Sequence, residues 1–177
     1  MTQKLALALA TVMLLAAPAA GHAALVGIGF GGSVYSINET MRLMPVAPLM
    51  VLQALRDTAV GDVAVPKETL VMGVLRHDSM SERNFQNPLA FEPQRWLPDS
   101  PQPMDAVAKR AAMPFGSGPR MCPGRYLALL EMKLAMAMLL ASFDIQAVDT
   151  PDGNEAQERM AVTMNPVGLS MRLRERR

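Results

Sequence analysis

The feature that most constrains this chain is an almost unbroken helix-forming run over residues 124–142. Its only charged residues are Arg125, Glu131 and Lys133, and most of the others are leucine, methionine or alanine. A helix that is apolar around most of its circumference is typical of a buried position. Pro123 stands just before the run and suits the first position of a helix, where no hydrogen bond is lost. The sequence therefore predicts a long, mostly buried helix.

The only cysteine of the chain, Cys122, lies at the start of this predicted helix. The positive end of a helix favours a thiolate over a thiol, and we expect the free amides of Gly124 and Arg125 to point back at the sulfur. Glycines in the preceding loop, Gly118 among them, permit tight turns and a close approach to a flat ligand. Arg120 adds a permanent cation two residues before the sulfur. This pattern indicates a thiolate prepared to bind a metal.

Two other interpretations of Cys122 follow from the residues alone. A cysteine at a helix start is often buried and inert, and a reactive nucleophile is the remaining alternative. A nucleophile needs a histidine base, and the sequence places neither His22 nor His77 beside the sulfur. One cysteine excludes an intramolecular disulfide, and two histidines give no Cys/His cluster for a structural zinc or an iron–sulfur centre.

Composition narrows the remaining function classes. The 177 residues suit one domain, and a formal net charge of +1 gives no electrostatic case for binding nucleic acid. The 16 methionines raise the question of a soft-metal site. However, Met132 and Met136 are one helical turn apart in an apolar run, which is the spacing of flexible core residues.

The N-terminal part has the pattern of a targeting segment. Lys4 precedes an apolar stretch over residues 5–17, and small residues follow Pro18. We therefore interpret residues 1–23 as a signal peptide, with a short membrane anchor or a plain apolar N-terminal segment as the alternatives. Residues 24–36 hold four glycines and no charge up to Ser36, and we predict a glycine-rich joint there. Residues 37–177 form the remaining domain.

That domain is predicted to contain short elements around the long helix. Ser36 or Asn38 is expected to cap a helix that Pro45 ends. Strands are expected at Thr58–Val60, Val63–Val65 and Leu70–Val74, because turn-forming pairs separate these β-branched runs. Residues 77–112 are proline-rich and predict a meandering segment with short helical turns. Residues 143–148, 160–164 and 169–173 predict strands, with a closing hairpin around residues 165–168.

The loop before the long helix matches a known pattern. Its spacing is Phe-x-x-Gly-x-Arg-x-Cys-x-Gly, and it resembles the haem-binding loop of cytochromes P450 at every defining position: Phe115, Gly118, Arg120, Cys122 and Gly124. Two further motifs precede it in the family's order. Glu39 and Arg42 resemble the Glu-x-x-Arg pair of the K helix, and Arg95 resembles the arginine of the meander.

The resemblance implies a fold and a cofactor. The fold class is mainly α with small β-sheets, as the C-terminal portion of a cytochrome P450: K helix, small sheet, meander, cysteine loop, buried L helix and terminal β-hairpin. The implied cofactor is haem b, with Cys122 as the ligand to its iron and Phe115 packed near the sulfur. Arg120 would pair with a haem propionate, and Ala128 would face the porphyrin. His77 or its neighbour Arg76 would approach a propionate, with a surface histidine as the alternative.

The resemblance also implies an activity and partners. The expected function is that of a haem-thiolate monooxygenase acting on a small organic substrate, reduced by a ferredoxin or flavin reductase that docks around Arg120 and Arg125. Lys109 and Arg110 would add positive potential to that surface. The buried cluster of Glu39, Arg42 and Arg95 would be structural.

The family's distal helix and substrate-pocket segments have no counterpart before residue 37. We therefore expect an incomplete, truncated chain, and the alternative function is a non-catalytic remnant with weak or absent haem binding. Localisation is expected to be cytoplasmic by the family's habit, or exported or membrane-associated if residues 1–23 act as a signal or an anchor.

Overall fold

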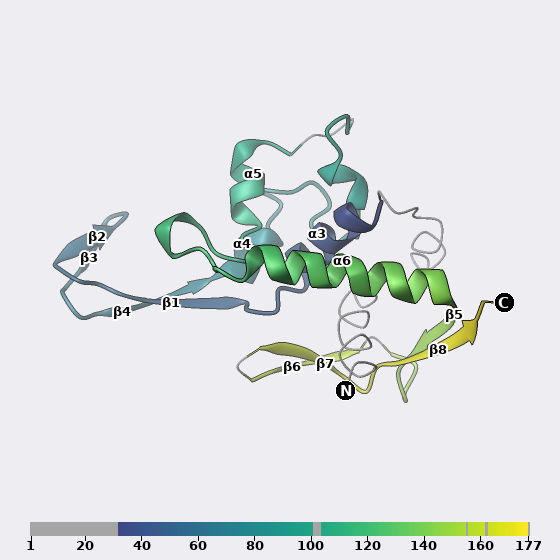
Figure 1. Cartoon of the computed structure of the whole chain (residues 1–177). Coiled ribbons are helices and arrows are strands. Elements are labelled where there is room, and N and C mark those ends of the chain that lie inside the picture. Colours follow the sequence, from purple (N-terminus) through teal and green to yellow (C-terminus); the bar gives the residue numbers. More distant parts are fainter. Residues whose placement is uncertain (1–31, 101–103, 155, 162, 177) are drawn as a thin grey trace.

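The computed structural model describes residues 32–100, 104–154, 156–161 and 163–176. Helices and two-stranded sheets alternate along these residues, and the longest helix runs across the middle of the molecule (Figure 1). The elements in chain order are α3 (Gly32–Leu43), β1 (Leu49–Gln53), β2 (Thr58–Val60), β3 (Val63–Val65), β4 (Leu70–Val74), α4 (Leu75–Ser79), η2 (Pro93–Trp96), α5 (Ala106–Ala111), η3 (Gly118–Arg120), α6 (Arg125–Ser142), β5 (Phe143–Asp149), β6 (Gln157–Met160), β7 (Met164–Val167) and β8 (Ser170–Glu175).

Helix α3 is the best-buried element of the fold. Ile37 and Met41, one turn apart, pack against Met136 of α6 in one hydrophobic cluster. The predicted cap at Ser36 or Asn38 is wrong, because the helix already begins at Gly32. Residues 32–36 of the predicted glycine-rich joint are therefore helical, and the rest of that joint and the predicted signal segment lie outside the described residues. Within the helix, the Thr40 hydroxyl donates to the Ser36 carbonyl at 2.8 Å.

The strands after α3 form a long antiparallel ribbon. Strand β1 pairs with β4, and β2 pairs with β3 at the far tip of the ribbon (Figure 1). The bounds of β2, β3 and β4 agree with the prediction, because Gly61 takes the positive φ of 61° that the tip requires. Much of the ribbon is exposed.

The meandering segment contains the predicted short helical turns. These are α4, η2 and α5, of which α5 begins at an aspartate cap: the Asp105 carboxylate accepts the amides of Val107 and Ala108 at 2.8 and 2.7 Å. The segment has a small core of its own around Phe85, Ala108 and Ala112. Packing on this core orders a proline-rich stretch that has little regular structure.

Helix α6 begins at Arg125, so Pro123 does not occupy its first turn. The prediction of a mostly buried helix is wrong for the described structure. Only Met136 and Leu139 of this helix are buried. Four other apolar residues have exposed fractions of 52% to 69%. We call these four the α6 stripe, because their spacing of three to four residues puts them on one side of the helix: Leu127, Leu130, Leu134 and Met138. The sequence shows that the helix is apolar, but no described element covers this side.

The C-terminal strands pair differently from the prediction. Strand β5 pairs with β8, while β6 pairs with β7, the next strand along the chain. Asn165 and Pro166 therefore lie inside β7 rather than in the predicted closing hairpin. Gly168, with φ of 72°, supplies the bend from β7 to β8. The described residues thus combine helices with four small two-stranded sheets, which is consistent with the predicted class of a mainly α fold with small β-sheets. Among the described helices, none has the length and apolar character to cross a membrane.

Candidate functional site

The centre of the scaffold is an ion cluster formed by Glu39, Arg42 and Arg95, which we call the Glu–Arg–Arg cluster. The carboxylate of Glu39 is fully buried and accepts two hydrogen bonds from Arg42, at 2.8 and 3.0 Å, and one from Arg95 Nε at 3.0 Å. The backbone amide of Glu92 and the indole of Trp96 donate to the same carboxylate, at 3.1 and 2.7 Å. All three members predicted from the resemblance therefore meet.

The two arginines connect this carboxylate to the meander. Arg42 donates to three backbone carbonyls, those of Ser79, Pro88 and Ala90, at 2.7, 2.7 and 3.1 Å. Arg95 donates to the Gln86 carbonyl at 3.0 Å. The Phe85 ring lies 4.9 Å from the Arg42 guanidinium. Fixed donors of this kind hold a segment that lacks regular hydrogen bonding of its own.

Sequence reasoning assigned no role to Trp96 or Phe85 in this cluster. The signal for Trp96 was present, since the residue directly follows Arg95. For Phe85 the sequence offers no signal, because its contact with Arg42 joins residues more than forty positions apart.

The cysteine loop is closed by backbone hydrogen bonds. The amide of Cys122 donates to the Phe115 carbonyl at 2.9 Å, and the amide of Met121 donates to Gly118 at 3.1 Å. Gly116 and Gly118 take φ values of 72° and 69°, which other residues rarely adopt. An added Cβ at either glycine would meet nothing within 4 Å, so the backbone angle and not crowding within the chain requires glycine. The glycines thus have the role that the sequence predicted for them.

The sulfur of Cys122 lies at the surface of the described structure. The predicted amide contact from Arg125 is wrong, because this amide donates to the Cys122 carbonyl at 3.2 Å. The Gly124 position is close to the sulfur, and a Cβ added there would lie 3.8 Å from Sγ. A side chain at position 124 would therefore stand in ordinary contact with the sulfur.

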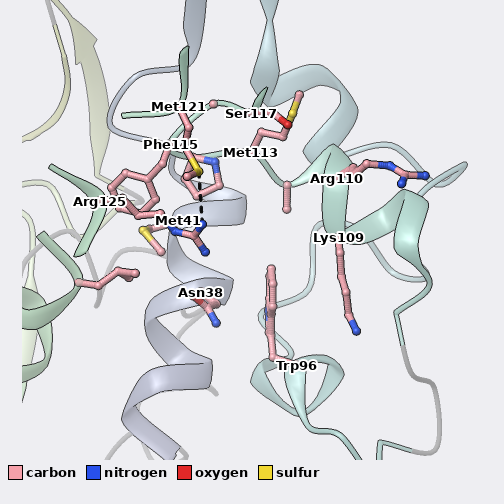
Figure 2. Close-up of a pocket in the computed structure, with 14 residues that line it drawn as sticks. Asn38, Met41, Trp96, Lys109, Arg110, Met113, Phe115, Ser117, Met121 and Arg125 are labelled. Atoms are coloured by element: carbon pink, nitrogen blue, oxygen red, sulfur yellow. Dashed lines mark hydrogen bonds between the residues drawn. The ribbon is translucent and has the colours of Figure 1, made fainter. Parts of the chain in front are cut away.

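Two other predicted site residues, Phe115 and Arg120, belong to this loop, and a third, Ala128, follows it in the sequence. The half-buried Phe115 packs on the cluster that contains Ile37, Met41 and Met136, and so fixes the loop to α3 and α6 (Figure 2). Arg120 is exposed in η3, and no described residue forms a hydrogen bond or ion pair with its guanidinium. Ala128 lies in the first turn of α6, where its amide donates to the Gly124 carbonyl at 2.9 Å.

His77 lies apart from the cysteine loop, on α4. Its side chain is 80% exposed, and Nδ1 is 3.3 Å from the carboxylate of Asp78, which is also exposed. Its neighbour Arg76 forms an ion pair with Glu158 of β6 and contacts the sulfur of Met80. The structure thus brings together the residues of the cysteine loop, and it brings together the Glu–Arg–Arg cluster, but it does not join His77 to either group.

Comparisons with known proteins agree with this arrangement. The family model of cytochrome P450 matches residues 35–173, and the chain therefore belongs to the cytochrome P450 family. It is 39% identical over 110 residues to the human mitochondrial 25-hydroxyvitamin D-1 alpha hydroxylase. These residues make up 62% of this chain and 21% of that protein. It is 30% identical over 146 residues to the steroid 17-alpha-hydroxylase/17,20 lyase of Squalus acanthias, covering 80% of this chain and 28% of that protein.

Solved structures give the same result. The crystal structure of the cytochrome P450DA haem domain superposes with a TM-score of 0.70 at 26% identity, covering 98% of this chain and 37% of that chain. A second cytochrome P450 crystal structure gives a TM-score of 0.74 at 28% identity, and the match covers 96% of this chain and 41% of that chain. The chain spans about a fifth to a quarter of the length of the curated relatives described above.

The cofactor that the family and these solved haem domains imply is haem b. The residues of the cysteine loop fit such a group. The sulfur is exposed, the space around Gly118 is open, and the Arg120 guanidinium has no carboxylate partner among the described residues. A soft thiolate, a flat open approach and a free cation are the features that binding of an iron porphyrin requires. Clusters of three or more histidine, cysteine or acidic residues that would suit another metal are absent from the described part of the chain.

Proposed function

We propose that this chain supplies the proximal, thiolate-bearing side of a cytochrome P450 monooxygenase, with Cys122 as the ligand to haem iron. The observation that supports it most is the exposed sulfur of Cys122 at the end of a loop closed onto Phe115. Because Gly116 and Gly118 fix the bends and Phe115 anchors the loop to the core, the position of the sulfur is set before any ligand arrives.

The neighbouring residues would orient the cofactor. Arg120 would pair with a propionate through a charge-assisted hydrogen bond, and Ala128 would leave room for the porphyrin face. Gly124 would keep the sulfur accessible. His77 is a second proposed propionate contact. The support for it is weaker than for Arg120, because His77 is exposed and already pairs with Asp78, whereas the Arg120 guanidinium has no partner among the described residues.

Activity and partners follow the family. When bound, haem with a thiolate ligand supplies the chemistry that activates O2 for insertion of one oxygen atom into a small organic substrate. A redox partner, of the ferredoxin or flavin reductase type, would dock near Arg120 and Arg125, where Lys109 and Arg110 add positive charge.

A spectroscopic experiment tests this proposal. The full chain is expressed, loaded with haem and reduced, and the difference spectrum with carbon monoxide is recorded. We expect a thiolate-type band for the parent chain and its loss in Cys122→Ala. Cys122→His is expected to retain pigment with an imidazole-type spectrum, because a neutral ligand then replaces the sulfur anion.

The matched control removes a sulfur elsewhere. Met72→Leu changes an exposed thioether on β4 and should leave the band unchanged. A parent chain without any haem absorbance, or a Cys122→Ala variant that keeps the thiolate-type band, would rule out Cys122 as the ligand.

A second candidate function is a non-catalytic protein with weak or absent haem binding. The α6 stripe favours it, because an uncovered apolar side lowers the stability of an isolated chain. Circular dichroism during haem titration separates the two functions. The monooxygenase proposal expects a folded chain that takes up one equivalent of haem with thiolate ligation, while the alternative expects no saturable uptake.

A further inference from the structure

A cavity of about 370 Å³ lies on one side of the cysteine loop, between α3, η2 and α5. In Figure 2, Asn38 of α3 and Trp96 of η2 lie on opposite sides of this space. Phe115 and Met121 of the cysteine loop line it, but Cys122 does not belong to the lining residues. The cavity is therefore separate from the exposed sulfur. Its volume is at the small end of the range for ligand pockets, roughly 300 to 1,000 Å³.

The charged residues of the cavity all have the same sign. Arg125 and Lys109 line it from α6 and α5, and the lining residues include no aspartate or glutamate. Figure 2 shows the Arg125 guanidinium on the α3 side and the Lys109 side chain beside Trp96, while Arg110 points away. A cavity lined by three cationic residues, two of which face into it, and by no acid repels metal ions and attracts an anion.

Arg125 is also without a strong acceptor. Its guanidinium donates to the sulfur of Met121 at 3.4 Å and lies 5.7 Å from the Tyr126 ring, and no described carboxylate pairs with it. A thioether is a weak acceptor, so most of the hydrogen-bonding capacity of this half-buried guanidinium stays unused. A carboxylate placed here would gain a charge-assisted hydrogen bond without breaking an existing ion pair.

Apart from the polar residues Asn38 and Ser117, most of the remaining lining is apolar. Met41, Phe115 and Leu129 form one part of the wall, and the Trp96 indole forms another, with its N–H already donated to Glu39. Trp96 therefore offers the cavity a hydrophobic face rather than a polar group. An inorganic anion would gain no binding free energy from this apolar surface, whereas an apolar chain or ring would gain it by burying apolar area against the surface.

We propose that this cavity binds a small amphipathic carboxylate, whose anionic end lies between Arg125 and Lys109 and whose apolar part packs against Trp96, Phe115 and Leu129. The proposal does not depend on haem ligation by Cys122. Because Phe115 and Met121 belong to both the cavity wall and the cysteine loop, an occupied cavity would stiffen the loop that carries the sulfur.

The fluorescence of Trp96 gives a direct test, because the chain contains one tryptophan. The full chain is titrated with octanoate, and octanol serves as the uncharged analogue. We expect a saturable change in emission with octanoate, about tenfold weaker binding of octanol, and weaker binding of octanoate at high salt. A change that does not saturate, or equal binding of octanoate and octanol, would overturn the proposal.

Two variants locate the binding. Arg125→Gln and Lys109→Gln should each weaken octanoate binding, the first by about tenfold because its guanidinium is half-buried. Arg56→Gln, an exposed arginine in the distant ribbon, is the control and should bind like the parent. Lys109 lies on α5 and is exposed, so its removal does not threaten folding. Octanoate binding that is insensitive to Lys109→Gln would mean that the anionic end does not lie between Arg125 and Lys109 and would contradict the proposal.

Discussion

The Glu–Arg–Arg cluster and the cysteine loop differ in almost every physical property. The cluster is buried, and each charge in it has several partners within the chain. The loop is exposed around Cys122 and Arg120, and its described hydrogen bonds are backbone bonds apart from the one that the Arg125 guanidinium donates to the Met121 sulfur. One region is complete by itself, whereas the other presents groups that have no partner in the described structure.

This difference separates scaffold from site. A buried charge network is costly to disrupt, because any lost partner leaves another charge without compensation. An exposed loop held by backbone turns loses little when a side chain changes, since water replaces the lost contacts. Substitutions in the cluster should therefore affect folding, while those at the tip of the loop should affect ligand binding.

The largest effect is expected for Glu39→Gln. The neutral amide leaves the buried Arg42 and Arg95 charges without their shared counterion, so the free energy of unfolding should fall by about 3–5 kcal/mol. Urea denaturation followed by circular dichroism measures the change. Glu92→Gln is the control, because Glu92 is more exposed and pairs only with Arg95, and its cost should be about 1 kcal/mol or less. If the two variants lose equal stability, burial does not distinguish the two regions.

A smaller loss is expected for Phe115→Ala, which tests the anchor between the regions. Phe115 is half-buried against the α3 and α6 cluster, so the loss should be about 2 kcal/mol, below the roughly 3–5 kcal/mol of a fully buried phenylalanine. The same denaturation experiment measures it. Leu55→Ala, at a position that is 80% exposed, should change stability by about 0.5 kcal/mol at most. A cost for Phe115→Ala as small as that of the control would mean that the loop is not anchored through this ring.

The turn glycines should show an effect smaller again. Gly118→Ala places a side chain at φ of 69°, where the strain costs about 1 kcal/mol although no atom lies within 4 Å of the new Cβ. Gly73→Ala is the matched control, because its new Cβ lies 3.7 Å from Met50, an ordinary contact. Thermal unfolding of the two variants should differ in midpoint. Equal midpoints would show that the loop relaxes out of the left-handed region.

The smallest effect is expected at a surface ion pair. Hydrogen bonds from Arg174 and then Arg176 lower the pKa of Asp144 below its ordinary value of 3.8. A carboxyl group with a lowered pKa contributes stability above its ordinary value and loses it as the pH falls through the folded value. Asp144→Asn should therefore shift the urea midpoint slightly at neutral pH and not at all at strongly acidic pH. A shift of equal size at both pH values would mean that charge is not the cause.

Local patterns predicted much of this fold. Strands β2, β3 and β4 agree with the prediction because Gly61 and the neighbouring turn pairs fix where each β-branched run ends. The C-terminal end of α6 also follows from composition. Glu39 and Arg42 are three residues apart on one helix, but their meeting with Arg95 followed only from the resemblance, since no local rule joins residues 56 positions apart.

Other features depend on long-range packing and were not predictable. Residues of β5 and β8 are separated by more than twenty positions, and the turn residues between them suggested a different hairpin. The exposure of α6 was missed for a similar reason, because hydrophobicity shows what a helix prefers to contact but not whether a neighbour is present. For the cysteine loop, the glycine bends were predicted correctly, whereas the amide of Arg125 was assigned the wrong acceptor.

The α6 stripe has a practical consequence for anyone who handles this chain. From Leu127 to Met138 it extends along about 17 Å of helix, long enough for several detergent tails or a hydrophobic dye to adsorb. Chaperones recognise nascent proteins by such rows of leucine. We therefore expect a preparation of this chain alone to aggregate readily unless a detergent or a partner covers the stripe.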